Sequence, residues 1–259
     1  MNQTRLTTFL LAILLCTGTQ FAISQSSSRF SINKFGNDKG DTLQYRMLFP
    51  DADTLRRYPL IIFLHGSGER GSDNEAQLKW GVANFATDQN MISHPALVIA
   101  PQCPEKMSWS NFSRGKNTSD IRLQPSPTKP MELLIGLIHQ LIKTMPVDSN
   151  RIYITGLSMG GFGTFDAIER YPHLFAAAVP VCGGGDISLA GSIAHMPIWI
   201  FSGAEDPAVN PAYSVDMLQA LTKAGAHPGF TQYPEVGHFS WLGAYRDALM
   251  IEWLFRQHK

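Results

Sequence analysis

Five continuous apolar runs recur along the chain, and helical patterns separate them. The runs occupy residues 58–66, 96–101, 151–156, 175–181 and 197–201. None of them alternates strictly between apolar and polar residues, which is typical of strands that are buried on both faces. Between two of them, leucines and isoleucines at helical spacing predict a helix over 130–145, with a proline at each end. This alternation of strands and helices predicts an α/β protein whose central sheet is mostly parallel, with helices on both faces.

Other segments fit the same scheme. Residues 211–225 and 244–257 predict two further helices. Residues 43–49 alternate between apolar and polar side chains, so we expect an edge strand with one face in water. The polar stretch 108–128 has little periodicity and predicts a surface loop or lid. Because no repeat or linker interrupts the chain, we expect residues 25–259 to form one domain.

The first 24 residues have the pattern of a secretory signal peptide. Arg5 is the only charged residue among them, an apolar run covers 9–15, and Ala22 and Ser24 stand at the −3 and −1 positions of a cleavage site. The run is shorter than the ~20 residues that a membrane-spanning helix needs. We therefore expect a protein that is secreted or periplasmic after cleavage, with no membrane span in the mature chain. An uncleaved anchor is one alternative, and a lipoprotein is another, because Cys16 ends the apolar run, although Leu15 stands where lipid attachment needs a small residue.

The composition excludes several classes of protein. Hydrophobic residues make up 44% of the 259, and 21 basic residues balance 21 acidic ones. A disordered chain needs lower hydrophobicity and a higher net charge, and a nucleic-acid-binding protein usually carries a basic excess. No set of His and Cys residues has metal-ligand spacing, and there is no phosphate-binding loop, so we expect no metal and no nucleic acid as a partner. Nothing in the sequence indicates an oligomeric state.

One short segment, Gly156-Leu157-Ser158-Met159-Gly160, matches the motif G-x-S-x-G. A predicted buried strand precedes it and a helical pattern follows, which is the strand–turn–helix context in which this motif presents a nucleophilic serine. Glycine two residues before and after the serine relieves collisions in the sharp turn. We predict that Ser158 is a nucleophile at the carboxyl edge of the sheet. The positive end of the following helix favours an oxyanion there. A glycine-rich turn with an ordinary serine is the alternative.

A serine hydroxyl is a poor nucleophile at neutral pH and needs a base that is oriented by an acid. In hydrolases with this motif, the acid and then the histidine follow the serine along the chain. Asp206 comes just after the predicted strand 197–201, and so at the same sheet edge as Ser158. We prefer it to its neighbour Glu205, because a proline fixes the turn behind it, and to Asp186, which follows the preceding strand.

The predicted base is His238, which lies between the last predicted strand and the last helix. His227 is the rival by chain order, but it precedes that strand. An oxyanion hole is also needed, and one donor should be the backbone N–H of Met159, the residue after the nucleophile. We assign the second donor to the backbone N–H of Ser67, with Gly68 as the alternative, because both lie in the glycine-rich loop after the first apolar run.

Six segments make the chain resemble the α/β-hydrolase superfamily. They are YPLIIFLHGSGERGSDN (58–74), APQCP (100–104), ITGLSMGGFGTFD (154–166), VPVCGGGD (179–186), FSGAEDPAV (201–209) and GHFSW (237–241). More narrowly, the chain resembles secreted bacterial esterases and predicted peptidases related to prolyl-oligopeptidase catalytic domains, phospholipase/carboxylesterases and feruloyl-type esterases. The resemblance implies an α/β-hydrolase fold with strand order 1-2-4-3-5-6-7-8. It also implies a Ser–Asp–His hydrolase that forms an acyl-enzyme and uses no cofactor.

That strand order separates the two cysteines that follow the signal peptide. Cys103 would follow strand 4 and Cys182 strand 6, with two strands between them. At ~4.8 Å per strand, the gap exceeds the reach of a disulfide. We therefore expect two free thiols.

The resemblance implies a carboxylesterase that acts on a small-molecule or saccharide ester, such as an acyl or feruloyl group on a plant polysaccharide. A small-peptide hydrolase and a non-catalytic relative that only binds are the alternatives. Trp109 and Trp241 are candidates for lining the acyl or leaving-group pocket. Packing in the core is the alternative for both.

Overall fold

The central sheet of the computed structural model, which describes residues 28–50 and 55–259, has eight strands. They are, in chain order, β1 (Ser31–Gly36), β2 (Thr42–Leu48), β3 (Tyr58–Leu64), β4 (Leu97–Pro101), β7 (Val147–Leu157), β8 (Ala177–Val181), β9 (Trp199–Gly203) and β10 (Gly229–Tyr233). The five apolar runs of the sequence correspond to β3, β4, β7, β8 and β9, and every residue of β3, β4 and β8 is buried. The predicted signal peptide, residues 1–24, lies outside the described residues.

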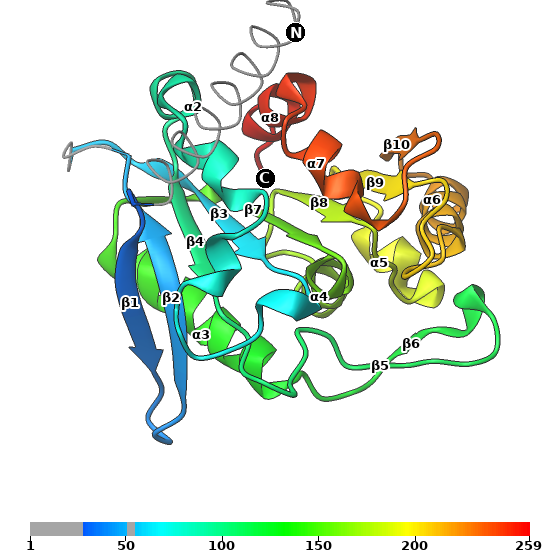
Figure 1. Ribbon diagram of the computed structural model, residues 1–259, viewed down its shortest axis with the longest axis horizontal. Coiled ribbons are helices and arrows are strands. Elements are labelled where there is room, and N and C mark those ends of the chain that lie inside the picture. The colour runs from blue at the N-terminus through cyan, green and yellow to red at the C-terminus, as the bar shows by residue number, and fades with distance from the viewer. Residues whose placement is uncertain (1–27, 51–54) are drawn as a thin grey trace, which may run out of the picture.

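The strands follow the order β1-β2-β4-β3-β7-β8-β9-β10 across the sheet. This is the order that the resemblance implied. β2 pairs antiparallel with both of its neighbours, and the other neighbouring strands pair in parallel. The prediction of a mostly parallel sheet is confirmed (Figure 1).

The predicted edge strand at 43–49 is β2, but its expected place in the sheet is wrong. β1 pairs along the outer side of β2, from Ser31 opposite Met47 to Gly36 opposite Thr42. β1 therefore forms the edge. Its sequence gives little signal, because Phe35 is the only one of its six residues that is buried.

Helices cover both faces of the sheet. They are α2 (Asp88–Ser93), α3 (Lys129–Thr144), α4 (Met159–Arg170), α5 (Ala190–Ile193), α6 (Ala212–Lys223), α7 (Trp241–Ala244) and α8 (Ala248–Phe255). The buried residues of α3 to α6 pack into one hydrophobic core, and those of α7 and α8 into a second core across the sheet (Figure 1). The last helix begins later than predicted, because the Asp247 side chain accepts the backbone N–H of Leu249 and caps α8 there.

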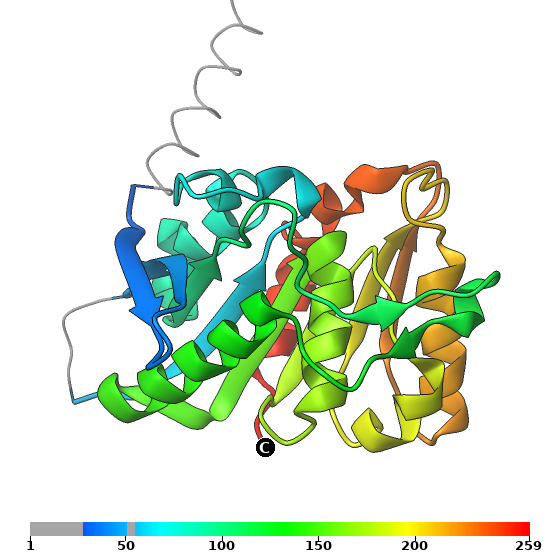
Figure 2. The ribbon, with the colours of Figure 1, turned by 90° about the horizontal axis from the view of Figure 1, so that it is seen from below.

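The polar stretch 108–128 is a surface excursion, as expected, but it contains a short hairpin. β5 (Phe112–Ser113) pairs antiparallel with β6 (Arg122–Leu123). The hairpin runs past α4 toward α6 (Figure 2). The sequence gave little sign of these strands, because two residues are too few for a periodic pattern.

Three carboxylates fasten this hairpin to the body of the protein. The bonds run from Asn111 N–H to Asp166 Oδ2 (2.8 Å), from Leu123 N–H to Asp186 Oδ2 (3.0 Å) and from Thr118 Oγ1 to Asp216 Oδ2 (2.6 Å). Asp166 and Asp186 are buried. Hydrogen bonds to charged acceptors are stronger than those between neutral groups. The segment is therefore held in place along its length.

Cys103 and Cys182 are buried free thiols. β3 and β7 lie between the strands that they follow, as expected. Burial raises the pKa of each thiol to about 12, so neither is a reactive thiolate at neutral pH. None of the helices within residues 28–50 and 55–259 combines the length and the apolar character that crossing a bilayer requires.

Candidate active site

Ser158 stands in the sharp turn between β7 and α4. Its backbone has φ +54° and ψ −115°, a region that residues other than glycine rarely adopt. A Cβ atom on Gly156 would lie 2.4 Å from the carbonyl oxygen of Gly160, and one on Gly160 would lie 2.0 Å from that of Leu64. Only glycine fits at both positions, so the two glycines of the motif make the sharp turn possible. The Ser158 side chain at the tip of this turn is partly accessible.

The structure brings Ser158, His238 and Asp206 together. Ser158 Oγ lies 2.9 Å from His238 Nε2, and His238 Nδ1 lies 2.7 Å from Asp206 Oδ2. A carboxylate can only accept, so the Nδ1 proton of a neutral imidazole points to Asp206. Nε2 is then free to accept the Ser158 proton. This is the geometry that activates a serine nucleophile.

Asp206 is buried, with 7% of its surface exposed. Its Oδ1 accepts the backbone N–H groups of Ala208 and Val209, each at 2.9 Å, which leaves Oδ2 aimed at His238. These bonds fix the carboxylate in one orientation.

The two rival acids do not contact the imidazole. Glu205 is exposed. The Asp186 carboxylate accepts the backbone N–H and the hydroxyl of Ser188, as well as the N–H of Leu123 in the hairpin. Asp186 therefore has a structural role. The rival base, His227, is exposed in the turn before β10.

Trp241 packs edge-on against His238, with ring centroids 5.0 Å apart. Trp241 is buried and also contacts Trp80 and the half-exposed Phe239. We call Trp80, Phe239 and Trp241 the aromatic cluster. Trp241 does not line the cavity beside Ser158 but packs against the imidazole, so its predicted place in that cavity is wrong, while a place on the leaving-group side stays a prediction.

The two predicted oxyanion donors flank Ser158. Met159 opens α4, where the first N–H groups of a helix have no partner within it. Ser67 opens the short 3₁₀ helix η1 (Ser67–Glu69), which follows β3. Both residues line one cavity with Ser158. In the described part of the chain, neither backbone N–H donates to another protein group. Gly68, the alternative donor, does not line this cavity.

His65 fixes the loop that carries Ser67. Its Nε2 accepts the backbone N–H of Cys103 at 2.9 Å, and its backbone carbonyl accepts Trp109 Nε1–H at 3.2 Å. Burial lowers the pKa of His65 to about 4, so the ring is neutral at pH 7. Trp109 has no exposed surface, and the prediction that it lines a substrate pocket is wrong. It packs between the loop and α4 instead.

The cavity beside Ser158 has a volume of about 240 Å³. Its lining includes four serines, the aromatic residues Phe162 and Tyr213, and the arginines Arg70 and Arg114. The sequence reasoning missed both arginines. Arg70 belongs to the glycine-rich loop and could have been inferred from it. Arg114 lies in the aperiodic stretch 108–128, where no pattern distinguishes it.

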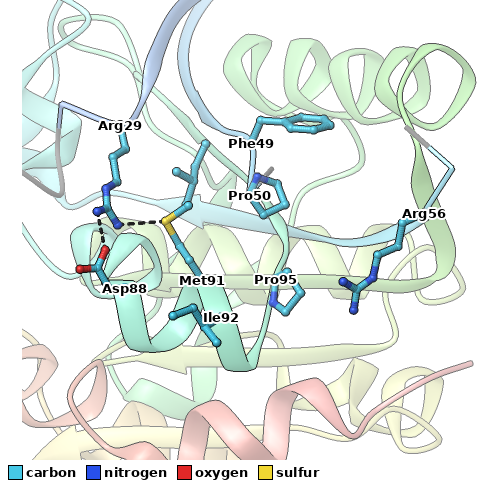
Figure 3. A pocket seen from close by; sticks show the side chains of 9 residues that line it. Arg29, Phe49, Pro50, Arg56, Asp88, Met91, Ile92 and Pro95 are labelled. Carbon is cyan, nitrogen blue, oxygen red and sulfur yellow. Dashed lines mark hydrogen bonds and ion pairs between the residues drawn. The ribbon is translucent and has the colours of Figure 1, made fainter. Parts of the chain in front are cut away.

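A larger cavity, of about 700 Å³, lies near the amino ends of the parallel strands, away from the carboxyl ends where Ser158 stands (Figure 3). Leu48 in its wall pairs with Val98 near the start of β4, whereas Ser158 follows the end of β7. Arg29 hydrogen-bonds to Asp88 at one side of this cavity (Figure 3). Among the described residues that line it there is no serine, cysteine or histidine, and its carboxylate, Asp88, is paired with Arg29.

Comparison with known proteins identifies the family. Residues 52–249 match the phospholipase/carboxylesterase family. The chain belongs to this family. It is 35% identical over 201 residues to lysophospholipase-like protein 1 of Mus musculus, with 72% of this chain and 82% of that protein covered. A crystal structure of a thermostable esterase superposes with a TM-score of 0.83 at 39% identity, covering 91% of this chain and 64% of that one. This chain therefore has the α/β-hydrolase fold of its family.

A more distant relative is a bifunctional acetylxylan esterase/xylanase of Neocallimastix patriciarum, 23% identical over 180 residues, or 70% of this chain. The chain spans 24% of that protein's length. It spans 58% of the length of poly(3-hydroxyalkanoate) depolymerase C of Paucimonas lemoignei, to which it is 25% identical over 261 residues, or 87% of this chain.

Proposed function

We propose that this chain is a secreted serine esterase that cleaves carboxylic esters through an acyl-enzyme. Ser158 is the nucleophile, His238 the general base and Asp206 the acid that orients it. The observation that carries the proposal is the unbroken contact from Ser158 Oγ through the imidazole to Asp206, at 2.9 and 2.7 Å. Membership of a carboxylesterase-type serine hydrolase family supports it.

In the first half of the reaction, Ser158 Oγ attacks the ester carbonyl carbon while His238 Nε2 takes the hydroxyl proton. The carbonyl oxygen becomes an oxyanion and accepts the N–H groups of Met159 and Ser67. Asp206 stabilises the imidazolium. When the intermediate collapses, the ester C–O bond breaks, and His238 gives its proton to the departing alcohol.

In the second half, water takes the place of the alcohol. His238 removes a proton from the water, and the hydroxide attacks the acyl carbon held on Ser158 Oγ. The same two N–H groups bind the second oxyanion. The acid leaves, Ser158 recovers its proton from His238, and the enzyme returns to its starting state.

Residues 25–259 form the catalytic domain in this proposal, and residues 1–24 direct export. Acyl groups on plant polysaccharides are one substrate class, which the named activity of the acetylxylan esterase relative supports. The intact hydrogen-bonded site favours an enzyme over a relative that only binds.

The test is hydrolysis of p-nitrophenyl acetate by Ser158→Ala. We expect kcat to fall at least about 10⁴-fold, because the nucleophile is lost while the oxyanion donors remain. Ser93→Ala is the matched control, since Ser93 is exposed on α2 and hydrogen-bonds to Gln89. Wild-type turnover no faster than that of Ser158→Ala would leave binding as the better explanation.

A second measurement separates esterase from peptidase. Because a peptidase also cleaves the more reactive ester, the deciding substrate is a peptide p-nitroanilide, and we expect the wild type to hydrolyse it no faster than Ser158→Ala does. Turnover of the peptide anilide that depends on Ser158 would favour the small-peptide hydrolase instead.

A further inference from the structure

Two guanidinium groups line the cavity beside Ser158, and none of its lining residues within 28–50 and 55–259 carries a carboxylate. The other polar side chains of the lining are hydroxyls. A positively charged cavity of this size, next to a nucleophile, is suited to a substrate with an anionic group close to its scissile bond.

Arg114 is held by aromatic rings and not by an acid. Its guanidinium carbon lies 4.6 Å from the ring centroid of Phe162 and 5.8 Å from that of Tyr213. Within the described residues it makes no ion pair or hydrogen bond. Stacking on a ring orients the guanidinium plane and leaves its N–H groups available. Phe162 is buried on α4, one turn after Ser158, so the charge is held close to the nucleophile.

Arg70 reaches the same cavity from the glycine-rich loop. Its Nε donates to the carbonyl of Met107 at 2.6 Å and its Nη1 to the carbonyl of Ser67 at 3.4 Å. Both acceptors are neutral backbone groups. Among the residues with described positions, no acid forms a salt bridge with Arg70. Its charge is therefore available to a ligand.

The cavity lies on the acyl side of the scissile bond. It is lined by Ser158 and by both oxyanion donors, Met159 and Ser67, but not by His238. The departing alcohol must lie near His238 Nε2, because that atom gives it a proton. The aromatic cluster flanks His238 instead. The arginines thus face the part of the substrate that stays on the serine.

We infer that the acyl group of the substrate carries a carboxylate. The enzyme hydrolyses monoesters of short dicarboxylic acids, and Arg114 and Arg70 bind the free carboxylate while Ser158 attacks the ester carbonyl. Guanidinium groups match carboxylates in shape and charge. Hydrolysis breaks the ester C–O bond, gives the alcohol its proton from water and releases a dicarboxylate. This inference rests on the proposed function of the same site.

The experiment measures kcat/KM for the monoethyl esters of succinic, glutaric and adipic acid in a pH-stat. Each is compared with its neutral analogue, in which a carboxamide replaces the free carboxylate. We expect the wild type to prefer the charged ester about 10- to 100-fold at the best chain length, the range for hydrogen bonds to a charged group. Added NaCl should reduce this preference, because the attraction is between charges.

In Arg114→Gln, the ratio of charged to neutral ester should fall toward one, and Arg114→Lys should retain part of it. The ratio reports recognition of the carboxylate, which a general loss of folded enzyme does not alter. Lys116→Gln is the matched control, because Lys116 is exposed on the same hairpin and does not line the cavity. Its ratio should equal that of the wild type.

Two results would overturn the inference while the proposed function stands. One is a ratio near one at all three chain lengths, with p-nitrophenyl acetate hydrolysed in a Ser158-dependent way. The other is a carboxylate preference confined to the alcohol side, seen with 4-carboxyphenyl acetate against 4-carbamoylphenyl acetate. Failure to hydrolyse any ester would overturn the proposed function, and this inference with it.

Discussion

The neighbouring acids Glu205 and Asp206 differ in burial and in contacts. Asp206 is buried and contacts His238, whereas Glu205 is exposed. We expect Asp206→Asn to lower kcat about 10⁴-fold, because an amide cannot hold the histidine in the required tautomer. Assays with p-nitrophenyl acetate check this. Glu205→Gln is the matched control and should stay within about twofold of the wild type, since substitutions at exposed sites have small effects. Equal losses in both variants would contradict the assignment of Asp206.

His65 makes the stability of the fold depend on pH. Its pKa is lowered from 6.5 to about 4 because the folded protein buries the ring. The unfolded chain therefore binds more protons between these values, and the stability that His65 contributes is complete above pH 6.5 and is lost as the pH falls toward 4. The loss amounts to at most roughly 3 kcal/mol.

Urea denaturation of His65→Gln across this pH range tests the effect. The free energy of unfolding should fall less steeply with acidification in the variant than in the wild type. His227→Gln, at an exposed histidine, should keep the wild-type slope. Identical slopes in all three proteins would show that His65 does not titrate in this way.

The sequence could predict the residues that now meet at Ser158, because each belongs to a local pattern with a fixed place at the sheet edge. It could not predict which way a loop side chain faces. Trp109 was a candidate pocket residue but lies buried against α4. It packs so closely there that a Cβ atom added to Gly163 would lie 2.4 Å from the Cβ atom of Trp109. Arg114 gave no signal, because its position depends on a ring of α4 and another of α6.

Among the elements, the hairpin β5–β6 depends most on side-chain contacts. Asp186 accepts a backbone N–H of β6 and forms an ion pair with Arg122 at 3.7 Å. We expect Asp186→Asn to lower the free energy of unfolding by about 1–3 kcal/mol and to speed cleavage of the hairpin by trypsin, because the charged acceptor is lost. Asp216→Asn makes the acceptor of a single bond to the tip neutral and should cost less. Equal rates of trypsin cleavage in the wild type and in Asp186→Asn would contradict this role for Asp186.

Among the strands too, those that are buried could be predicted from the sequence and those that are exposed could not. Strands buried on both faces gave continuous apolar runs, and the sequence predicted them. β1 was missed because its residues are mostly exposed and it is held by backbone pairing to β2. The hairpin was missed because it is anchored by carboxylates from distant helices and loops, which no local pattern records.

At the scale of the whole molecule, the proposal includes export and processing. Expression of the full chain should give a mature protein that begins at Gln25, because Ala22 and Ser24 supply the small residues that the cleavage site needs. Mass spectrometry of the exported protein checks the new N-terminus. Ser24→Phe should block cleavage, whereas Ser27→Phe, beyond the site, should not. An exported protein that still begins at Met1 would contradict the proposal.

The pairing of β3 with β7 brings together residues that are far apart in the chain. Leu60 lies opposite Ile152, and Leu64 opposite Gly156. Contacts of such long range form slowly, because a large loop must close before they contribute. The centre of the sheet therefore cannot assemble until β7 and all the segments before it are present in the same compartment. In the proposed export from the N-terminus, the chain would meet this condition only after passage of β7, and the centre of the sheet would then fold only on the far side of the membrane.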